Sequence, residues 1–308
     1  MAEDQGVNGD LWTEQGAILL QRLGWEKIGD SNIDIEGTDG IKHGIDSLFK
    51  YKDFARLLDE GIFVEAKRYK TTSFSPSKIG DWVIKLDHKI NEISLDEGFY
   101  NTYPAMRETK TRNGLLLLWF SDAKNFPKVE ESIQTALEGV NIPKGRIAKS
   151  NRLFVMTNPD ILRLASVIDV VDHWNSKSGN GKLKFYYPST FGKPVQEEST
   201  LSLEYMYSQF LVGRAEEISN GKVSQSNFVF YFGDNSVDSY EMLHAALIAN
   251  KAIQNNHKLF IYQYQRDDDF RKIKPDILKI FQGEGYPDVS FEQMNILADL
   301  PNWLSNAK

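Results

Sequence analysis

The tripeptide Glu65-Ala66-Lys67 directly follows the apolar run Gly61-Ile62-Phe63-Val64. Such a run predicts a buried strand, and strand side chains alternate between the two faces of a sheet. Glu65 and Lys67 are two positions apart, so both point to one face while Ala66 points to the other. The chain is therefore constrained to a fold in which a carboxylate and an amine emerge together from a core strand.

A second carboxylate, Asp46, stands in the segment Gly44-Ile45-Asp46. A strand over residues 44–51 and a strand over residues 61–69 are predicted, joined by a turn with a short helix. Antiparallel pairing at roughly 5 Å would then place Asp46, Glu65 and Lys67 within one coordination sphere.

These residue types suit one kind of chemistry. Two carboxylates can hold Mg²⁺, or alternatively Mn²⁺, and leave positions open for water and phosphate. The metal polarises a phosphoryl group and activates water, while Lys67 positions or deprotonates that water or stabilises developing charge. The competing interpretation is an ordinary Glu/Lys alternation on a surface strand, because E-x-K is a common tripeptide.

The pattern Asp46…Glu65-x-Lys67 resembles the signature of the PD-(D/E)xK, or restriction-endonuclease-like, nuclease superfamily, although Ile45 replaces the proline that precedes the aspartate. The segment from Trp12 to Trp25 resembles the first helix of the Holliday-junction-resolvase and Mrr-like branches. The resemblance covers roughly residues 10–125. It implies a metal-dependent DNA nuclease with Asp46 and Glu65 as metal ligands, Lys67 as the catalytic amine and Glu14 as an accessory acid and metal ligand. Alternatively, Glu14 only favours the helix macrodipole, with Thr13 as the N-cap.

The order of elements predicts an α/β fold. Helices are expected at 11–23, 76–93 and 127–139, and strands at 33–36, 115–120 and 152–157, with a helix running from there to about residue 174. With the resemblance, this order implies a restriction-endonuclease-like mixed sheet flanked by helices, with a C-terminal α/β region. The polar stretch 189–200 is the expected linker, dividing the chain into a nuclease-like domain at 1–190 and an accessory or assembly domain at 200–308.

The C-terminal region repeats the α/β rhythm. Strands are predicted at 183–187, 228–232 and 259–262, and helices at 237–255 and 271–281. Asp234 and Asp238 follow a strand end, where open α/β sheets bind ligands, but helix capping by Asn235, Ser236 or Asp238 explains these side chains at least as well.

Charge bears on the substrate. The 308 residues carry a net charge of −7, which opposes unaided binding to nucleic acid, since phosphate affinity comes largely from Lys and Arg. Three groups of basic residues could nevertheless bind phosphates locally: Lys67-Arg68-Tyr69-Lys70; Lys78, Lys85 and Lys89; and Arg107, Lys110 and Arg112. The alternative is that these side chains only face solvent. DNA would then be bound by a local basic groove or by a partner subunit.

Other features narrow the possibilities. The chain has no cysteine, which excludes disulfides and thiolate zinc sites and fits a reducing compartment. No apolar run is long enough to span a membrane, and an acidic N-terminus without a hydrophobic signal region favours the cytoplasm. His43, three residues before Asp46, is expected in a surface turn, or else near the site. Asp34 and Glu36 are expected on the exposed face of an edge strand, or else as an additional metal ligand through Glu36.

The sequence thus favours a Mg²⁺-dependent endonuclease acting on double-stranded DNA. It would be an effector subunit that a partner protein, or a homo-oligomer, controls in a prokaryotic anti-phage or restriction system. Two alternatives remain open: a non-catalytic assembly subunit with a nuclease-like fold, and a nucleotide sensor that uses the C-terminal half.

Overall fold

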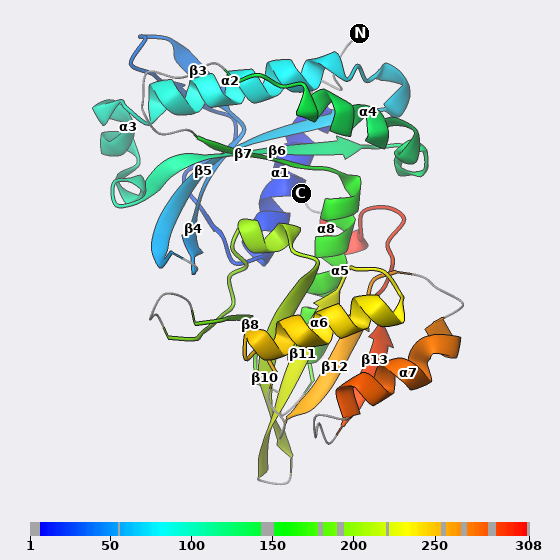
Figure 1. Cartoon of the computed structure of the whole chain (residues 1–308). Coiled ribbons are helices and arrows are strands. Elements are labelled where there is room, and N and C mark those ends of the chain that lie inside the picture. Colours follow the sequence, from blue (N-terminus) through cyan, green and yellow to red (C-terminus); the bar gives the residue numbers. More distant parts are fainter. Residues whose placement is uncertain are drawn as a thin grey trace. The chain divides into compact units, whose positions relative to one another are not determined.

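A computed structural model describes residues 7–54, 56–142, 151–177, 181–189, 194–219, 222–253, 257–265, 270–282 and 288–306. The chain divides into two compact units, one formed by residues 1–162 with 298–308 and the other by residues 163–297 (Figure 1). The predicted linker at 189–200 falls inside the second unit. The assignment of a nuclease-like domain to 1–190 and an accessory domain to 200–308 stays a prediction.

The first unit is built around a five-stranded sheet of order β1-β4-β5-β6-β7. Pairs β1/β4 and β4/β5 are antiparallel, whereas β5/β6 and β6/β7 are parallel. The sheet is therefore mixed, as predicted. Its elements and their neighbours are α1 (Val7–Arg22), β1 (Glu26–Lys27), β2 (Ile33–Glu36), β3 (Lys42–Ile45), β4 (Ser47–Asp53), β5 (Leu58–Tyr69), α2 (Ser77–Ile93), α3 (Glu97–Thr102), β6 (Lys110–Phe120), α4 (Pro127–Glu138), β7 (Arg152–Met156) and α8 (Asn302–Ser305).

Strand β6 shows how helices cover both faces of this sheet. On one face, Trp12 of α1 stacks on Trp119 with ring centroids 5.7 Å apart, and its Nε1 donates to the carbonyl of Leu117 at 3.2 Å. On the other face, Leu118 and Phe120 pack with Ile79 and Val83 of α2 and Ile133 of α4. The alternation follows the two-residue period of a strand, and Figure 1 shows α1 and α2 on opposite sides of the sheet.

The segment before the sheet differs from prediction. Instead of one strand over 44–51, the chain bends at Asp46, so that β3 pairs with β2 in a separate two-stranded sheet while β4 joins the main sheet. His43 is on β3 and 7% exposed rather than in a surface turn. The predicted short helix is not found among the described residues between the strands: β4 and β5 pair as far as Asp53 and Leu58, residues 54, 56 and 57 are in a turn, and Leu57 has a φ of 55°.

The second unit holds a six-stranded sheet of order β13-β12-β11-β10-β8-β9. It includes a long hairpin of β10 and β11, of which the sequence predicted only the second part of β11, whereas the predicted strand–helix alternation that follows is confirmed. The elements are α5 (Asn158–Asn175), which begins in the first unit, β8 (Lys184–Tyr187), β9 (Gln196–Glu198), β10 (Phe210–Ser219), β11 (Lys222–Tyr231), α6 (Val237–Ala249), β12 (Lys258–Gln263), α7 (Phe270–Gln282) and β13 (Val289–Gln293).

Helices cover both faces of this sheet as well. Leu243 and Leu247 of α6 and Ile277 of α7 pack on one face against Val229 and Ile261. Trp174 of α5 lies against Phe228 and Phe260 on the other face, with ring centroids 4.7 and 6.0 Å apart. Within the described part of the chain, none of the helices is both long and apolar enough to cross a membrane.

Candidate active site

Asp46 and Glu65 meet where β4 and β5 begin to separate. The antiparallel register pairs Ser47 with Val64, so the next position on each strand brings Asp46 opposite Glu65. The backbone N–H of Ala66 donates to Asp46 Oδ2 at 2.7 Å, which fixes the orientation of this carboxylate. The bend at Asp46 and the end of the ladder thus turn two carboxylates toward the same place, as the spacing predicted.

Lys67 lies between these two carboxylates. Its Nζ is 3.4 Å from Asp46 Oδ2 and 3.3 Å from Glu65 Oε2. The Lys67 side chain is 17% exposed and that of Glu65 is 9% exposed, so the group is largely shielded from water. Lys67 therefore contacts both of the other two predicted residues, and its ammonium already touches both carboxylates.

Lys89 of α2 is a member of the site that sequence reasoning missed. Its Nζ donates to Glu65 Oε1 at 2.5 Å and to the carbonyl oxygen of Gly44 at 2.6 Å. The sequence marked Lys89 only as one of several basic residues on the helix. No signal in the sequence singled it out, because the contact depends on the parallel pairing of Glu65 with Leu116, which puts Glu65 on the face of the sheet that α2 covers.

The arrangement balances two carboxylates with two ammonium groups. Oxygen ligands that converge on one cation are the donors that Mg²⁺ and Mn²⁺ prefer. For Glu65 to ligate a metal through either oxygen, Lys67 or Lys89 has to give up an ion pair. The site can thus exchange an ammonium for a divalent cation and free a lysine to act on a substrate.

Glu14 is placed differently from the other three predicted residues. It lies on α1, its side chain is 44% exposed, and its Oε2 is 3.5 Å from Lys27 Nζ of β1. One turn earlier, Asp10 accepts from Asn32 Nδ2 at 3.2 Å, and the N–H of Asn32 donates to the carbonyl of Asp46 at 2.9 Å. The first turns of α1 are therefore linked to the Asp46 bend.

The basic groups predicted near the site separate in the structure. Lys70 follows β5 directly and is exposed, and Lys85 is exposed one turn before Lys89 on α2. Lys110, in contrast, pairs with Glu60, five residues before Glu65 on β5. At about 3.3 Å per residue the two positions are about 16 Å apart. The group around Lys110 therefore does not belong to a groove at the carboxylates.

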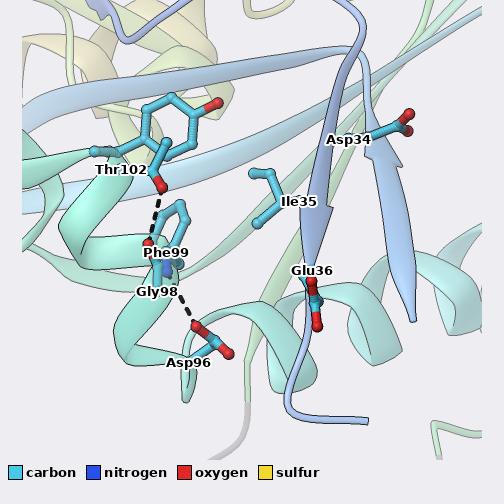
Figure 2. A pocket seen from close by; sticks show the side chains of 8 residues that line it. Asp34, Ile35, Glu36, Asp96, Gly98, Phe99 and Thr102 are labelled. Carbon is cyan, nitrogen blue, oxygen red and sulfur yellow. Dashed lines mark hydrogen bonds between the residues drawn. The ribbon is translucent and has the colours of Figure 1, made fainter. Parts of the chain in front are cut away.

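Asp34 and Glu36 lie beside a separate hollow. It has a volume of about 480 Å³ and is lined by Asp34, Ile35, Glu36, Asp96, Gly98, Phe99, Thr102 and Tyr103. In Figure 2, Ile35 points toward α3 while Asp34 points away from it. Asp34 and Glu36 are exposed and Ile35 is buried, which confirms the predicted edge-strand alternation. None of Asp46, Glu65 and Lys67 lines this hollow.

In the second unit, the candidate ligand-binding residues after β11 have structural roles at the start of α6. Ser236 is the N-cap of α6 and accepts from the N–H of Ser239 at 3.2 Å, so the capping interpretation is confirmed for this residue. Asp238 stands in the first turn, where its charge favours the helix dipole. Asp234 Oδ1 accepts from Gln265 Nε2 at 3.4 Å.

Comparison with known proteins agrees with the geometry of the first unit. Residues 1–160 match the family described as the GAPS4 protein PD-(D/E)XK nuclease domain. The match ends close to residue 162, where the first part of that unit ends. The Holliday-junction-resolvase or Mrr-like branch is not named by this match and stays a prediction. A comparison with curated proteins finds no match.

Proposed function

Because the chain belongs to the GAPS4 PD-(D/E)XK nuclease-domain family, we propose that it is a Mg²⁺-dependent endonuclease that hydrolyses phosphodiester bonds of double-stranded DNA. One observation carries the proposal. Lys67 Nζ lies 3.4 Å from Asp46 and 3.3 Å from Glu65, so the two carboxylates converge on the Lys67 ammonium, where a metal cation could take its place.

The donor set fits the proposed metal. Asp46 and Glu65 offer only oxygen atoms, which Mg²⁺ prefers, and Mn²⁺ accepts the same ligands. Asp46 is already held by the backbone N–H of Ala66, so its side chain loses little conformational freedom when a metal binds. When bound, the metal would supply Lewis-acid polarisation of a phosphoryl oxygen and would lower the pKa of an attacking water.

The side chains of the chain itself have distinct proposed roles. Asp46 and Glu65 hold the cation, and Glu65 also orients the attacking water. Lys67 exchanges its two ion pairs for contact with the reacting phosphate, where its ammonium stabilises developing negative charge or its amine takes a proton from the water. Glu14 is proposed as the accessory acid and further ligand, on the resemblance of its helix.

The charge distribution supports control by a partner. Lys70 and Lys89 provide positive charge near the site, but the net charge of the chain is −7, and affinity for DNA depends on neutralised phosphates. We therefore propose a cytoplasmic effector subunit of a prokaryotic anti-phage or restriction system, delivered to DNA by a partner protein or by assembly with further copies.

The test is a cleavage assay on duplex DNA, single-stranded DNA and RNA with Mg²⁺, with Mn²⁺ or with EDTA. We expect cleavage of duplex DNA that requires metal and is lost in Asp46→Asn and Glu65→Gln. Equal cleavage in EDTA would exclude the metal mechanism. If wild type fails to cut with and without the product of a neighbouring gene, the assembly-subunit alternative replaces the nuclease.

A further inference from the structure

A second group of potential metal ligands includes His43, which precedes Gly44 in the chain, whereas Asp46 of the proposed active site follows it. Asp39 stands in the turn between β2 and β3, His43 is on β3, and His88 is on α2. His43 Nε2 is 3.2 Å from Asp39 Oδ1, and His88 Nε2 is 3.6 Å from Asp39 Oδ2. Two imidazoles from separate elements thus converge on the two oxygens of one carboxylate.

The spacing of these atoms fits a transition-metal shell. One ligand atom from each of Asp39, His43 and His88 lies within 4.8 Å of the others. Zinc binds nitrogen at about 2.0–2.1 Å and carboxylate oxygen at about 2.0–2.2 Å in tetrahedral geometry, which separates neighbouring ligand atoms by about 3.4 Å. The two nitrogen-to-oxygen distances lie on either side of that value, so small side-chain movements would complete the shell.

The surroundings leave room and hold the ligands in place. A Cβ added at Gly37 would lie 2.9 Å from His43 Nε2 and 2.9 Å from Asp39 Oδ1, so only a residue without a side chain keeps this point free. The turn is fixed to α2, since Thr38 Oγ1 donates to Glu92 Oε2 at 2.5 Å. The N–H of Ile41 also donates to Asp39 Oδ1 at 3.0 Å, which orients this carboxylate.

We propose that Asp39, His43 and His88 form a second metal site, which binds a first-row transition dication such as Zn²⁺ through two imidazoles and one carboxylate. Its donors differ from the oxygen-only carboxylates proposed for Mg²⁺, because imidazole favours Zn²⁺ over Mg²⁺. Three protein ligands leave at least one coordination position open to water.

The second site would fix the junction next to the proposed active site. His43 precedes Gly44 and His88 precedes Lys89, and Lys89 Nζ already joins the Gly44 carbonyl at 2.6 Å to Glu65 at 2.5 Å. A cation bound by His43 of β3 and His88 of α2 would hold the two elements together beside Lys89 and restrict the movement of this lysine. The second dication therefore has a positioning role, which is separate from any contact with substrate.

The test is a titration of the full-length protein with Co²⁺ and with Zn²⁺, in saturating Mg²⁺ to occupy the first site. Visible absorption reports Co²⁺ bound to nitrogen ligands, and calorimetry reports the affinity for Zn²⁺. His88 is 56% exposed, so His88→Asn should keep the fold, and circular dichroism checks this. His173→Asn is the matched control, because His173 is an exposed histidine on α5.

We expect wild type to bind one Co²⁺ or Zn²⁺, and His88→Asn or His43→Asn to weaken binding by at least about tenfold, since loss of even an outer partner costs about that much. His173→Asn and Asp46→Asn should bind as wild type does. Absence of binding to wild type, equal binding by His88→Asn, or loss of binding in Asp46→Asn would each overturn the proposal. Because these readouts do not use cleavage, a protein that binds Zn²⁺ but never cuts DNA would refute only the nuclease proposal.

Discussion

Replacing Lys67 by methionine should tighten the binding of Mg²⁺. The Lys67 ammonium is 3.4 Å from Asp46 and 3.3 Å from Glu65, so it occupies the position between the proposed ligands. An entering dication either stays beside the ammonium or displaces it from both ion pairs. Both routes cost free energy, and both costs disappear in Lys67→Met.

The size of the effect follows from Coulomb's law. Two unit charges 4 Å apart interact by about 1 kcal/mol under full water screening, and a dication doubles this to about 2 kcal/mol. The Lys67 side chain is only 17% exposed, so the screening there is weaker than in water. Since about 1.4 kcal/mol is a factor of ten in affinity, we expect Lys67→Met to bind Mg²⁺ at least about tenfold more tightly.

Isothermal titration of Mg²⁺ into wild type and Lys67→Met measures this directly. Lys85→Met is the control, because Lys85 is an exposed residue on α2 and its replacement changes the net charge by the same amount. The control should bind Mg²⁺ as wild type does. Unchanged or weaker binding by Lys67→Met would refute the inference that Asp46 and Glu65 are the ligands.

Three further variants test other parts of the structure. Glu14→Gln should slow cleavage with little change in the free energy of unfolding, because the exposed ion pair with Lys27 is worth at most about 1 kcal/mol; an unchanged rate would remove Glu14 from the proposed site. Gly114→Ala should destabilise the first unit by about 1–3 kcal/mol in urea unfolding, because its Cβ would lie 2.8 Å from side-chain atoms of Ile90, Leu153 and Leu86. Burial raises the pKa of Asp122, but hydrogen bonds from Thr71 and Asn125 outweigh it, so the pKa is lowered below 3.8. The stabilisation by ionised Asp122 is present above pH 3.8 and is lost as the pH falls through the lowered pKa. The difference in the free energy of unfolding between wild type and Asp122→Asn should therefore shrink in acid, and a difference that grows would contradict this assignment.

Much of the site could be predicted from sequence because it depends on local periodicity. The two-residue period of β5 puts Glu65 and Lys67 on one face, and the apolar run before them identifies the strand. Antiparallel pairing with the preceding strand, β4, then brings Asp46 opposite Glu65. Helix α2 was found in the same way, from apolar residues at helical spacing.

The remaining features depend on contacts between distant segments. The contact of Lys89 with Glu65 requires knowing which face of the sheet α2 covers. The cluster of Asp39, His43 and His88 joins a turn, a strand and a helix, and the bend at Asp46 that carries His43 into a separate sheet leaves no periodic signal. Likewise, the distance of Lys110 from the carboxylates follows from the parallel register of β5 and β6, which composition does not reveal.

The rate at which Lys67→Met cleaves duplex DNA in saturating Mg²⁺ tests the central claim most directly. If Lys67 is the catalytic amine, the variant should hold the metal and fold normally but cleave at least about 100-fold more slowly than wild type, in line with the usual contribution of a proton-transfer group. Lys85→Met, measured beside it, should keep nearly the full rate. Undiminished cleavage by Lys67→Met would contradict the assignment of this site.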